Sequence, residues 1–181
     1  TAEAAAKAGA TVVNEPRKGY GQACLSGIEY LLNKPSPPEI IAFMDGDHSD
    51  YPAQVSRLIA PIKAGEADIV IGSRALGKQE RGAMFPQQRF GNWLAALLIQ
   101  ILYGYRITDL GPFRAISTAS LKKLGMSDSN YGWTVEMQIK AIQQGLRMAE
   151  VPVDYRKRIG HSKIAGTVNG TVKAGYKIIH T

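Results

Sequence analysis

Apolar runs and segments of helical periodicity alternate along the chain, and turn-forming residues separate them. This alternation is typical of an α/β protein whose sheet is largely parallel. The predicted strands are Thr11–Asn14, Ile40–Met44, Ile69–Ile71, Phe113–Ile116 and Met148–Tyr155. The predicted helices are Ala2–Ala8, Gly21–Leu32, Pro52–Ala64, Arg89–Tyr103, Thr118–Leu124, Trp133–Gln144 and Thr167–Ile179. A polar loop from Gly72 to Gln88 connects the third strand to the most apolar helix.

The length of the chain predicts one domain. Its 181 residues, 45% of them hydrophobic, are enough for a single core. Because the chain opens on Thr1 and closes inside the segment 167–179, we expect residues 1–181 to be one partial domain. No signal peptide is visible, and the longest apolar stretch, Trp93 to Leu102, is too short for a bilayer of about 30 Å. A single cysteine, Cys24, excludes an intrachain disulfide framework and fits a reducing, cytoplasmic compartment.

The net charge of +7 favours an anionic partner, namely nucleic acid, an anionic membrane surface or a phosphorylated substrate. Nucleic acid is the weakest of these, because no aromatic residues are interleaved in the basic loop 156–163. The predicted helix Arg89–Tyr103 has very little polar face, so it is buried or lies against lipid. Together with the basic loop it predicts peripheral attachment to the cytoplasmic membrane face, with a core helix or a dimer contact as the alternative.

Two carboxylates one residue apart, Asp45 and Asp47, follow directly after the predicted strand Ile40–Met44. Ligands of an open parallel sheet collect outside the carboxyl ends of its strands. Mg²⁺ and Mn²⁺ prefer carboxylate oxygens together with phosphate oxygens, and Gly46 lets backbone and ligand approach closely. Asp and Gly are also ordinary turn residues, so a polar turn is the alternative.

Two further strand ends carry groups that suit an anion. Arg17 and Lys18 stand ahead of a predicted helix that opens with Gly21, and a helix N-terminus with such a glycine is an anion site. Gly72-Ser73-Arg74 ends the third strand, where the guanidinium can clamp a phosphate. A plain turn and a solvated arginine are the alternatives. Three consecutive strand ends with metal or anion chemistry favour a shared site.

Five ordered segments extend this pattern over nearly the whole chain. They are Arg17-Lys18-Gly19-Tyr20-Gly21, Asp45-Gly46-Asp47 with Pro52, Gly72-Ser73-Arg74, Thr108-Asp109-Leu110-Gly111-Pro112-Phe113-Arg114 and Gly160-His161-Ser162-Lys163. In order and spacing the chain resembles family 2 glycosyltransferases, in the branch of dolichyl-phosphate and polyprenyl-phosphate mannose or glucose synthases. The resemblance implies a GT-A fold, which is a Rossmann-like α/β sandwich with a mostly parallel central sheet. It also implies inverting transfer of mannose or glucose from a GDP or UDP sugar to a polyprenyl or dolichyl phosphate.

By this resemblance, Asp45 and Asp47 would correspond to the Asp-x-Asp motif that holds Mg²⁺ or Mn²⁺ on the donor diphosphate. The family's opening strand lies before Thr1, so we expect the first strand of the fold and part of the donor site to be missing. Pro112 is a second departure, because many relatives resemble Ser-Gly-Phe-Arg at this place. A proline stiffens the backbone and removes a donor, which bears on the acceptor side.

Breaking a sugar–phosphate bond leaves negative charge on the departing nucleoside diphosphate. A metal at Asp45 and Asp47, helped by Arg17 or Lys18, would stabilise that charge. The predicted nucleotide-sugar site consists of Arg17, Lys18, Gly21, Asp45, Gly46, Asp47, Gly72, Ser73 and Arg74.

The acceptor decides what else is needed. A hydroxyl needs a general base, whereas a lipid phosphate is already ionised and chiefly needs cations. Asp109 and Glu136 are the candidate bases, and a surface ion pair with Lys140 is the alternative for Glu136. The candidate phosphate cradle consists of Arg114, Arg156, Arg158, Ser162 and Lys163. The residues expected to be catalytic are Asp47, Asp109, Arg114 and Glu136. A saccharide or glycolipid hydroxyl as acceptor, and a sugar-1-phosphate nucleotidyltransferase, are the alternatives.

Overall fold

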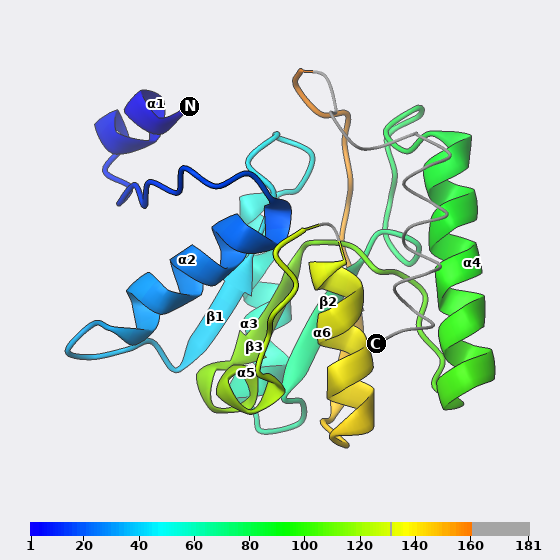
Figure 1. Ribbon diagram of the computed structural model, residues 1–181. Coiled ribbons are helices and arrows are strands. Elements are labelled where there is room, and N and C mark those ends of the chain that lie inside the picture. Colours follow the sequence, from blue (N-terminus) through cyan, green and yellow to red (C-terminus); the bar gives the residue numbers. More distant parts are fainter. Residues whose placement is uncertain (131, 161–181) are drawn as a thin grey trace.

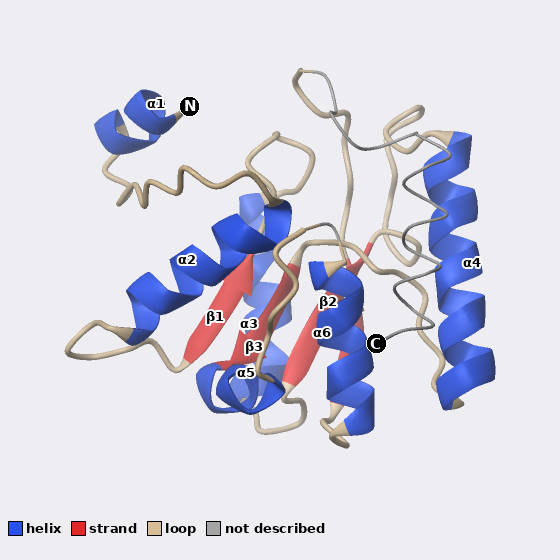
Figure 2. Cartoon of the chain, viewed as in Figure 1, coloured by secondary structure: helices blue, strands red, loops and turns tan. Residues whose placement is uncertain are grey.

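A mixed sheet forms the centre of the chain in the computed structural model, which describes residues 1–130 and 132–160. Its strands are β1 (Ile40–Phe43), β2 (Ile69–Ser73), β3 (Arg114–Ser117) and β4 (Met148–Pro152), in the order β1-β3-β2-β4. β3 pairs antiparallel with β1 and β2, and β4 pairs parallel with β2. β1, β2 and β4 therefore share one direction, which confirms the predicted α/β class, and β3 is reversed (Figure 2).

Helices cover both faces of the sheet (Figure 1). The described helices are α1 (Ala2–Lys7), which stands apart from the sheet, and α2 (Tyr20–Leu32), α3 (Val55–Lys63), α4 (Pro86–Tyr103), α5 (Thr118–Leu124) and α6 (Trp133–Gln143). α2, α5 and α6 pack on one face of the sheet, and α3 packs on the other. α4 packs against α6 at the side of the molecule.

The alternation of side chains in β2 and β3 explains these layers. Ile69, Ile71 and Ile116 point towards α2, α5 and α6, whereas Val70 and Ala115 point towards α3. All five have 0% exposure, and full burial of a large aliphatic side chain contributes about 1.5–3 kcal/mol. The two apolar faces thereby hold the strand ends, where the polar residues gather, in fixed positions.

The predicted strand Thr11–Asn14 does not form. This segment is extended but lies outside the sheet, with Val12 and Val13 43% and 40% exposed. A strand needs partners for its N–H and C=O groups, and the ladders of the described sheet do not include this segment. An apolar pair is a local signal, whereas strand formation depends on a neighbour.

The other predicted elements of the described chain form, Thr118–Leu124 with the predicted bounds and the rest with shifted ends. α4 begins at Pro86 rather than Arg89, because proline suits the first helical position and the Gln88 side chain accepts the Phe85 N–H at 2.9 Å. β2 extends to Ser73, and β4 ends at Pro152. The predicted helix Pro52–Ala64 begins as a 3₁₀ turn, Pro52–Gln54, before α3. The predicted helix Thr167–Ile179 lies outside the described residues.

Candidate functional site

The carboxyl ends of β1, β2 and β4 meet at one edge of the sheet (Figure 1). Residues 45–50 follow β1, Arg74 follows β2, and residues 153–160 follow β4. The Ile159 N–H donates to the Asp47 carbonyl at 2.9 Å, so the first and last of these segments are in direct contact. The shared direction of the three strands therefore builds one site from three distant parts of the sequence.

The acidic turn runs from Asp45 to Asp50. Asp47 Oδ1 accepts from the N–H and the hydroxyl of Ser49 at 3.0 and 2.5 Å, and His48 has a φ of +73° within this turn. Asp45 is half-buried, and burial together with the charge of Asp47 raises its pKa. Asp50 is 2% exposed, and burial raises its pKa to about 6. The turn thus concentrates carboxylates whose charges repel one another.

Asp45 and Asp47 fit a hard divalent cation. Their oxygens are the ligand type that Mg²⁺ and Mn²⁺ prefer, and a cation would offset the repulsion that raises the pKa of Asp45. The guanidinium of Arg158 lies 3.2 Å from Asp47 Oδ2, so this carboxylate already attracts positive charge. Residues 1–130 and 132–160 contain no group of three side chains that could hold a metal. Phosphate and water oxygens would therefore complete the coordination shell.

Two arginines of the predicted acceptor cradle lie against the acidic turn. Arg156 donates to the His48 carbonyl at 2.5 Å and stacks over the Tyr51 ring at 4.4 Å. Arg158 pairs with Asp47. The structure therefore places both guanidinium groups against the acidic turn, and their contact with an acceptor phosphate stays a prediction.

Arg114 is fully buried. Its guanidinium donates to the carbonyls of Leu110, Gly111 and Thr134, and burial lowers its pKa to about 10. It fastens the turn before β3 to α6 and has no exposed face, which corrects its predicted catalytic and phosphate-binding roles. The members of the predicted cradle outside the described residues are Ser162 and Lys163.

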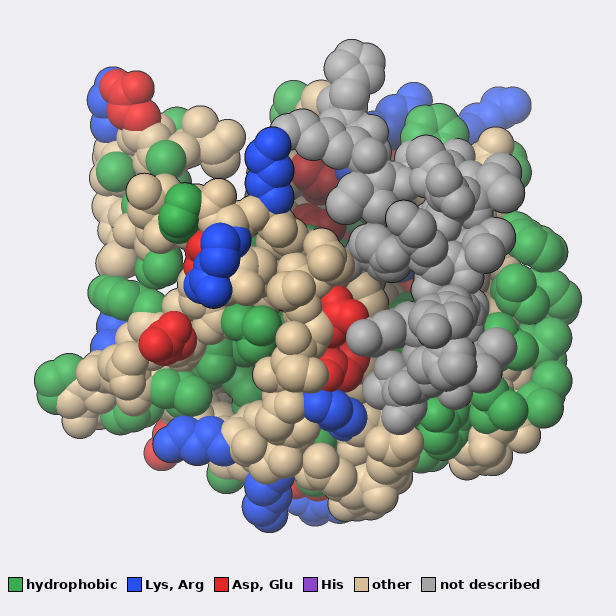
Figure 3. Space-filling view, in the orientation of Figure 1, with side chains coloured by type: hydrophobic (Ala, Val, Ile, Leu, Met, Phe, Trp, Pro, Cys, Tyr) green, Lys and Arg blue, Asp and Glu red, His purple; other side chains and the backbone are tan. Residues whose placement is uncertain are grey.

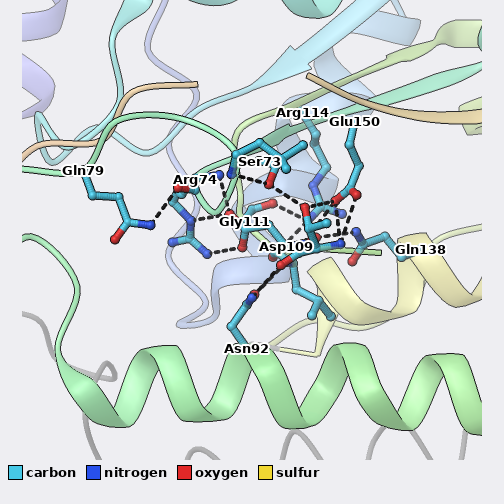
Figure 4. A network of polar contacts seen from close by, with 12 residues as sticks. Ser73, Arg74, Gln79, Asn92, Asp109, Gly111, Arg114, Gln138 and Glu150 are labelled. Atoms are coloured by element: carbon cyan, nitrogen blue, oxygen red, sulfur yellow. Dashed lines mark hydrogen bonds and ion pairs between the residues drawn. The ribbon is translucent and has the colours of Figure 1, made fainter. Parts of the chain in front are cut away.

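An ion pair between Arg74 and Asp109 occupies the neighbouring part of the edge (Figure 4). Asp109 Oδ2 accepts from the N–H and Nε of Arg74 at 2.7 and 2.8 Å, and Oδ1 accepts from Nη2 at 2.6 Å. Burial disfavours the charge of Arg74, but the pair with Asp109 raises its pKa. Asp109 is 1% exposed and both its oxygens are engaged. This geometry argues against Asp109 as a general base and against Arg74 as a free phosphate clamp.

Glu150 and Asn92, which are not among the predicted site residues, hold the loop of this ion pair in place (Figure 4). Glu150 accepts the N–H of Thr108 at 2.9 Å and that of Asp109 at 3.1 Å. Asn92 of α4 accepts the Leu110 N–H and donates to the Thr108 carbonyl, both at 2.9 Å. Asn92 is a polar break in an apolar helix, a signal that could have identified it. Glu150 gives no such signal, because its partners lie in a distant loop.

Glu136 lies on α6 and is 3% exposed. Its carboxylate pairs with Lys140 at 2.8 Å and accepts the N–H groups of Ser127 and Asp128 at 3.1 and 2.8 Å. Burial works to raise its pKa, but these donors outweigh burial and lower it. The ion pair with Lys140 is confirmed, and the predicted role as a general base is not supported.

The N-terminus of α2 is occupied by the chain itself. The Gly21 N–H donates to the Asn130 carbonyl at 3.0 Å. A Cβ at Gly21 would lie 2.0 Å from the carbonyl oxygen of Asp128. The glycine is therefore required for contact with a loop of the same chain, which corrects its predicted role in an anion site.

Gly72 and Ser73 are buried within β2. A Cβ at Gly72 would lie 2.9 Å from Cγ1 of Val153, so this glycine allows β2 and the segment after β4 to pack closely. The Ser73 hydroxyl lies 2.6 Å from that of Thr108. Both residues are buried against other parts of the chain, which corrects their predicted contact with the nucleotide sugar.

Arg17 and Lys18 lie in the exposed segment before α2. Arg17 pairs with Glu15 at 2.8 Å, and the side chain of Arg17 is 70% exposed. Gly46 in the acidic turn is also exposed, and a Cβ there would meet nothing within 4 Å. Among the predicted donor residues, Asp45, Gly46 and Asp47 of the acidic turn therefore combine carboxylate oxygens with open space for a ligand.

A pocket of about 530 Å³ opens beside the Arg74–Asp109 pair. Its wall includes Arg89 and Trp93 from α4, together with Asp109 and Gln79. Arg89 donates to Gln79 Oε1 at 2.9 Å, and Trp93 is 56% exposed. The pocket thus offers a guanidinium and an aromatic ring close to the strand-end edge.

Residues 1–125 match the model of the family described as glycosyl transferase family 2. An uncharacterised glycosyltransferase of Mycobacterium tuberculosis is 32% identical over 176 residues, which cover 96% of this chain and 77% of that protein. The undecaprenyl-phosphate mannosyltransferase of Micrococcus luteus is 28% identical over 159 residues, which cover 85% of this chain and 64% of that protein.

Solved structures show the same fold. Glucosyl-3-phosphoglycerate synthase from Mycobacterium tuberculosis, in complex with Mn²⁺, uridine-diphosphate-glucose and phosphoglyceric acid, superposes with a TM-score of 0.65 at 20% identity. The match covers 97% of this chain and 62% of that structure, so the chain spans less than two thirds of its structural neighbour.

Proposed function

The chain belongs to glycosyl transferase family 2 and has the GT-A fold, and from this premise we propose that it transfers a hexose from a nucleotide sugar to a polyprenyl phosphate. The transfer inverts the configuration at the anomeric carbon of the sugar. The sugar is mannose or glucose, carried by GDP or UDP. The relative named undecaprenyl-phosphate mannosyltransferase supports a lipid phosphate as acceptor. The alternative of a sugar-1-phosphate nucleotidyltransferase is set aside, because the family match is to glycosyltransferases.

The observation that carries the choice of acceptor is the state of the two predicted bases. Asp109 is held by Arg74, and Glu136 is held by Lys140 and by loop amides. A hydroxyl acceptor needs a free base to remove its proton, whereas a phosphate is already ionised near neutral pH. Engagement of both candidates therefore favours an acceptor that needs no base.

On the donor side, the acidic turn serves the leaving group. When bound at Asp45 and Asp47, Mg²⁺ or Mn²⁺ supplies a Lewis acid for the charge that develops on the departing diphosphate. Arg156 and Arg158 bring two guanidinium groups to the same turn, where they add positive charge for the diphosphate. Gly46 leaves open space above the turn for the ligand.

On the acceptor side, the pocket beside α4 suits a lipid phosphate. Arg89 can hold the anionic headgroup, and Trp93 with the neighbouring aliphatic wall can contact the first isoprene units. The pocket also borders the Arg74–Asp109 pair, so an acceptor there would lie beside the strand-end edge.

The outer face of α4 supports attachment to a membrane surface. Figure 3 shows hydrophobic side chains gathered over this helix. The large exposed ones on α4 are Phe90, Trp93, Ile101 and Leu102. In the part of the chain that the structure describes, no helix is both long and apolar enough to cross a bilayer. We propose that α4 lies in the interface of an anionic membrane, which its apolar face and the net charge of +7 both favour.

An acceptor screen tests the activity. The protein is incubated with GDP-mannose or UDP-glucose and with polyprenyl phosphate, polyprenol or phosphoglyceric acid as acceptor. We expect transfer to polyprenyl phosphate, loss of transfer with EDTA, and loss in Asp47→Ala with the melting temperature unchanged, because a ligand rather than core volume is removed. Transfer only to a hydroxyl acceptor would contradict the lipid-phosphate assignment, and full activity of Asp47→Ala would contradict the metal site.

Sedimentation with vesicles tests the membrane contact. We expect binding to vesicles that contain anionic lipid, and weaker binding for Trp93→Ser, because the indole side chain is exposed on the apolar face. Val13→Ser changes an exposed apolar residue in the segment between α1 and α2, which lies across the molecule from α4 in Figure 1, and serves as the control. Equal losses in both variants would argue against a docking role for α4.

A further inference from the structure

The side-chain amide of Gln79 lies between two hydrogen-bonding partners at the pocket beside α4. We propose that Gln79 is a positioning residue: it orients the guanidinium of Arg89 for an anion in this pocket and leaves the positive charge of that guanidinium uncompensated. The role rests on the proposed acceptor site. It names a residue that sets the preference of that site for a phosphate over an uncharged head group.

The orientation of the Gln79 amide follows from its two partners. Gln79 Nε2 donates to the Arg74 carbonyl at 2.6 Å (Figure 4), and Gln79 Oε1 accepts from Arg89 Nη2 at 2.9 Å. A carbonyl can only accept and a guanidinium can only donate, so a reversed amide would meet both partners with the wrong atom. The Arg74 carbonyl therefore directs the amide oxygen of Gln79 to Arg89.

The backbone around Gln79 is held by the segment that follows β4. The Tyr155 N–H donates to the Lys78 carbonyl at 2.9 Å, and the Tyr155 carbonyl accepts the Glu80 N–H at 2.8 Å. Tyr155 is 4% exposed and belongs to a small buried apolar cluster. The residues on either side of Gln79 are thus bonded to a buried part of the chain, which fixes the point from which its side chain reaches Arg89.

A neutral acceptor orients Arg89 without cancelling its charge. In the part of the chain that the structure describes, no carboxylate forms an ion pair with Arg89. Among the described residues of the pocket wall, Asp109 is the one carboxylate, and Arg74 engages both its oxygens. The charge of Arg89 is therefore available to a ligand, and its remaining N–H donors can bind phosphate oxygens.

This arrangement predicts that a carboxylate in place of the amide is more harmful than loss of the amide. Gln79→Met removes both hydrogen bonds and should weaken the binding of a phosphate about three- to tenfold, because Arg89 is no longer oriented. Gln79→Glu keeps an acceptor for Arg89 but adds a negative charge beside the anion, so we expect a loss of at least about tenfold. If Gln79 only held the Arg74 carbonyl, the two variants would behave alike, since neither side chain can donate to it.

The test measures binding to the whole protein by isothermal titration calorimetry, with and without Mn²⁺ and UDP or GDP. The probes are geranyl phosphate, a short prenyl phosphate, and geraniol, its uncharged counterpart. Affinity for geranyl phosphate should fall from wild type to Gln79→Met to Gln79→Glu, whereas affinity for geraniol should not follow this order. Added salt should reduce the difference between the two variants, because it screens exposed charges.

Gln87→Glu is the matched control, because it makes the same change of side chain and charge at an exposed position of α4. Positions i and i+2 of a helix do not face each other, so the new carboxylate points away from Arg89 and affinity should stay that of wild type. In steady-state transfer, Gln79→Glu should raise the KM for the phosphate acceptor and leave the KM for the nucleotide sugar unchanged. A general loss of folding would not separate these constants, and melting temperatures check each variant.

Arg89→Met separates the pocket from the positioning role. If this variant binds geranyl phosphate as wild type does, or if wild type does not bind it, the acceptor pocket and the positioning role are overturned together. If Arg89→Met binds weakly but Gln79→Glu binds as well as Gln79→Met or better, the positioning role alone is overturned.

The double variant tests whether Gln79 acts through Arg89. Adding Gln79→Met to Arg89→Met should cause no further loss of affinity, and losses that multiply would contradict the positioning role. Sugar transfer is assayed separately. A protein that binds geranyl phosphate but transfers no sugar refutes the proposed function and leaves the positioning role to the binding data.

Discussion

Replacing Asp109 by asparagine tests whether the Arg74–Asp109 pair is structural or catalytic. The substitution keeps the size of the side chain and one acceptor oxygen, but it leaves the guanidinium without a counter-charge. The side chains of Arg74 and Asp109 are 13% and 1% exposed. Removing one partner of a buried pair costs about 3–5 kcal/mol, and we expect a loss of this size in the free energy of unfolding.

Glu15→Gln is the matched control, because Arg17 binds Glu15 with the same three donors. Its N–H and Nε lie 2.9 Å from Oε1, and its Nη2 lies 2.8 Å from Oε2. Arg17 is mostly exposed, so it stays hydrated when the carboxylate is lost, and a much smaller loss is expected. Exposure of the arginine, 70% for Arg17 against 13% for Arg74, is therefore the main difference between the two pairs.

Urea unfolding followed by circular dichroism gives both free energies, and sugar transfer is measured well below the unfolding midpoint. A slope that stays the same between variants shows that the folded and unfolded states remain comparable. If Asp109→Asn costs less than about 1 kcal/mol while it abolishes transfer, the carboxylate acts on substrate and the structural assignment is refuted. Equal losses in Asp109→Asn and Glu15→Gln would refute the argument from burial.

Two further predictions concern stability. Gly21→Ala places a Cβ 2.0 Å from the Asp128 carbonyl oxygen and should destabilise the fold by about 1–3 kcal/mol. Gly27→Ala on the same helix meets no atom within 4 Å and should stabilise the fold. Thermal unfolding distinguishes the two variants, and equal shifts in melting temperature would contradict the packing argument. Hydrogen bonds from Arg147 lower the pKa of Asp68 below its unfolded value of 3.8, so the carboxylate stabilises above that pH and loses its effect as the pH falls through the folded pKa. Asp68→Asn should therefore be less stable than wild type at neutral pH and converge with it in acid, and a gap that widens in acid would count against the pair.

The sheet and its helices were predictable because buried strands and helices carry apolar residues at the periodicity of a strand or of a helix. Ile69, Val70 and Ile71 form a continuous apolar run, which is typical of a strand buried on both faces and can be read from the local sequence. Thr11–Asn14 was not predictable in the same way. Its valines resemble a strand, but pairing depends on a neighbouring strand that a local pattern cannot reveal.

The same distinction between local and distant partners applies to the site. The acidic turn follows directly after a strand, and the lysine four residues after Glu136 indicated the ion pair that was the alternative to its predicted catalytic role. Asp109 finds its arginine 35 residues away, and Arg114 donates to backbone carbonyls, which no side-chain pattern in the sequence reveals. A charged residue suggests chemistry until its partner is known, which is why these two were assigned to catalysis and found in the framework.

Because β3 is reversed, the residues at the strand-end edge precede this strand, whereas they follow β1, β2 and β4. The approach to β3, residues 108–113, contributes to the pocket wall but forms no rung of the ladder between β1 and β3. The register of β3 against β1 is therefore set by residues 114–117, whereas Asp109 and Phe113 of the approach are buried and hold it to the rest of the fold. The proposed donor turn and the proposed acceptor pocket are therefore encoded in separate stretches of the chain.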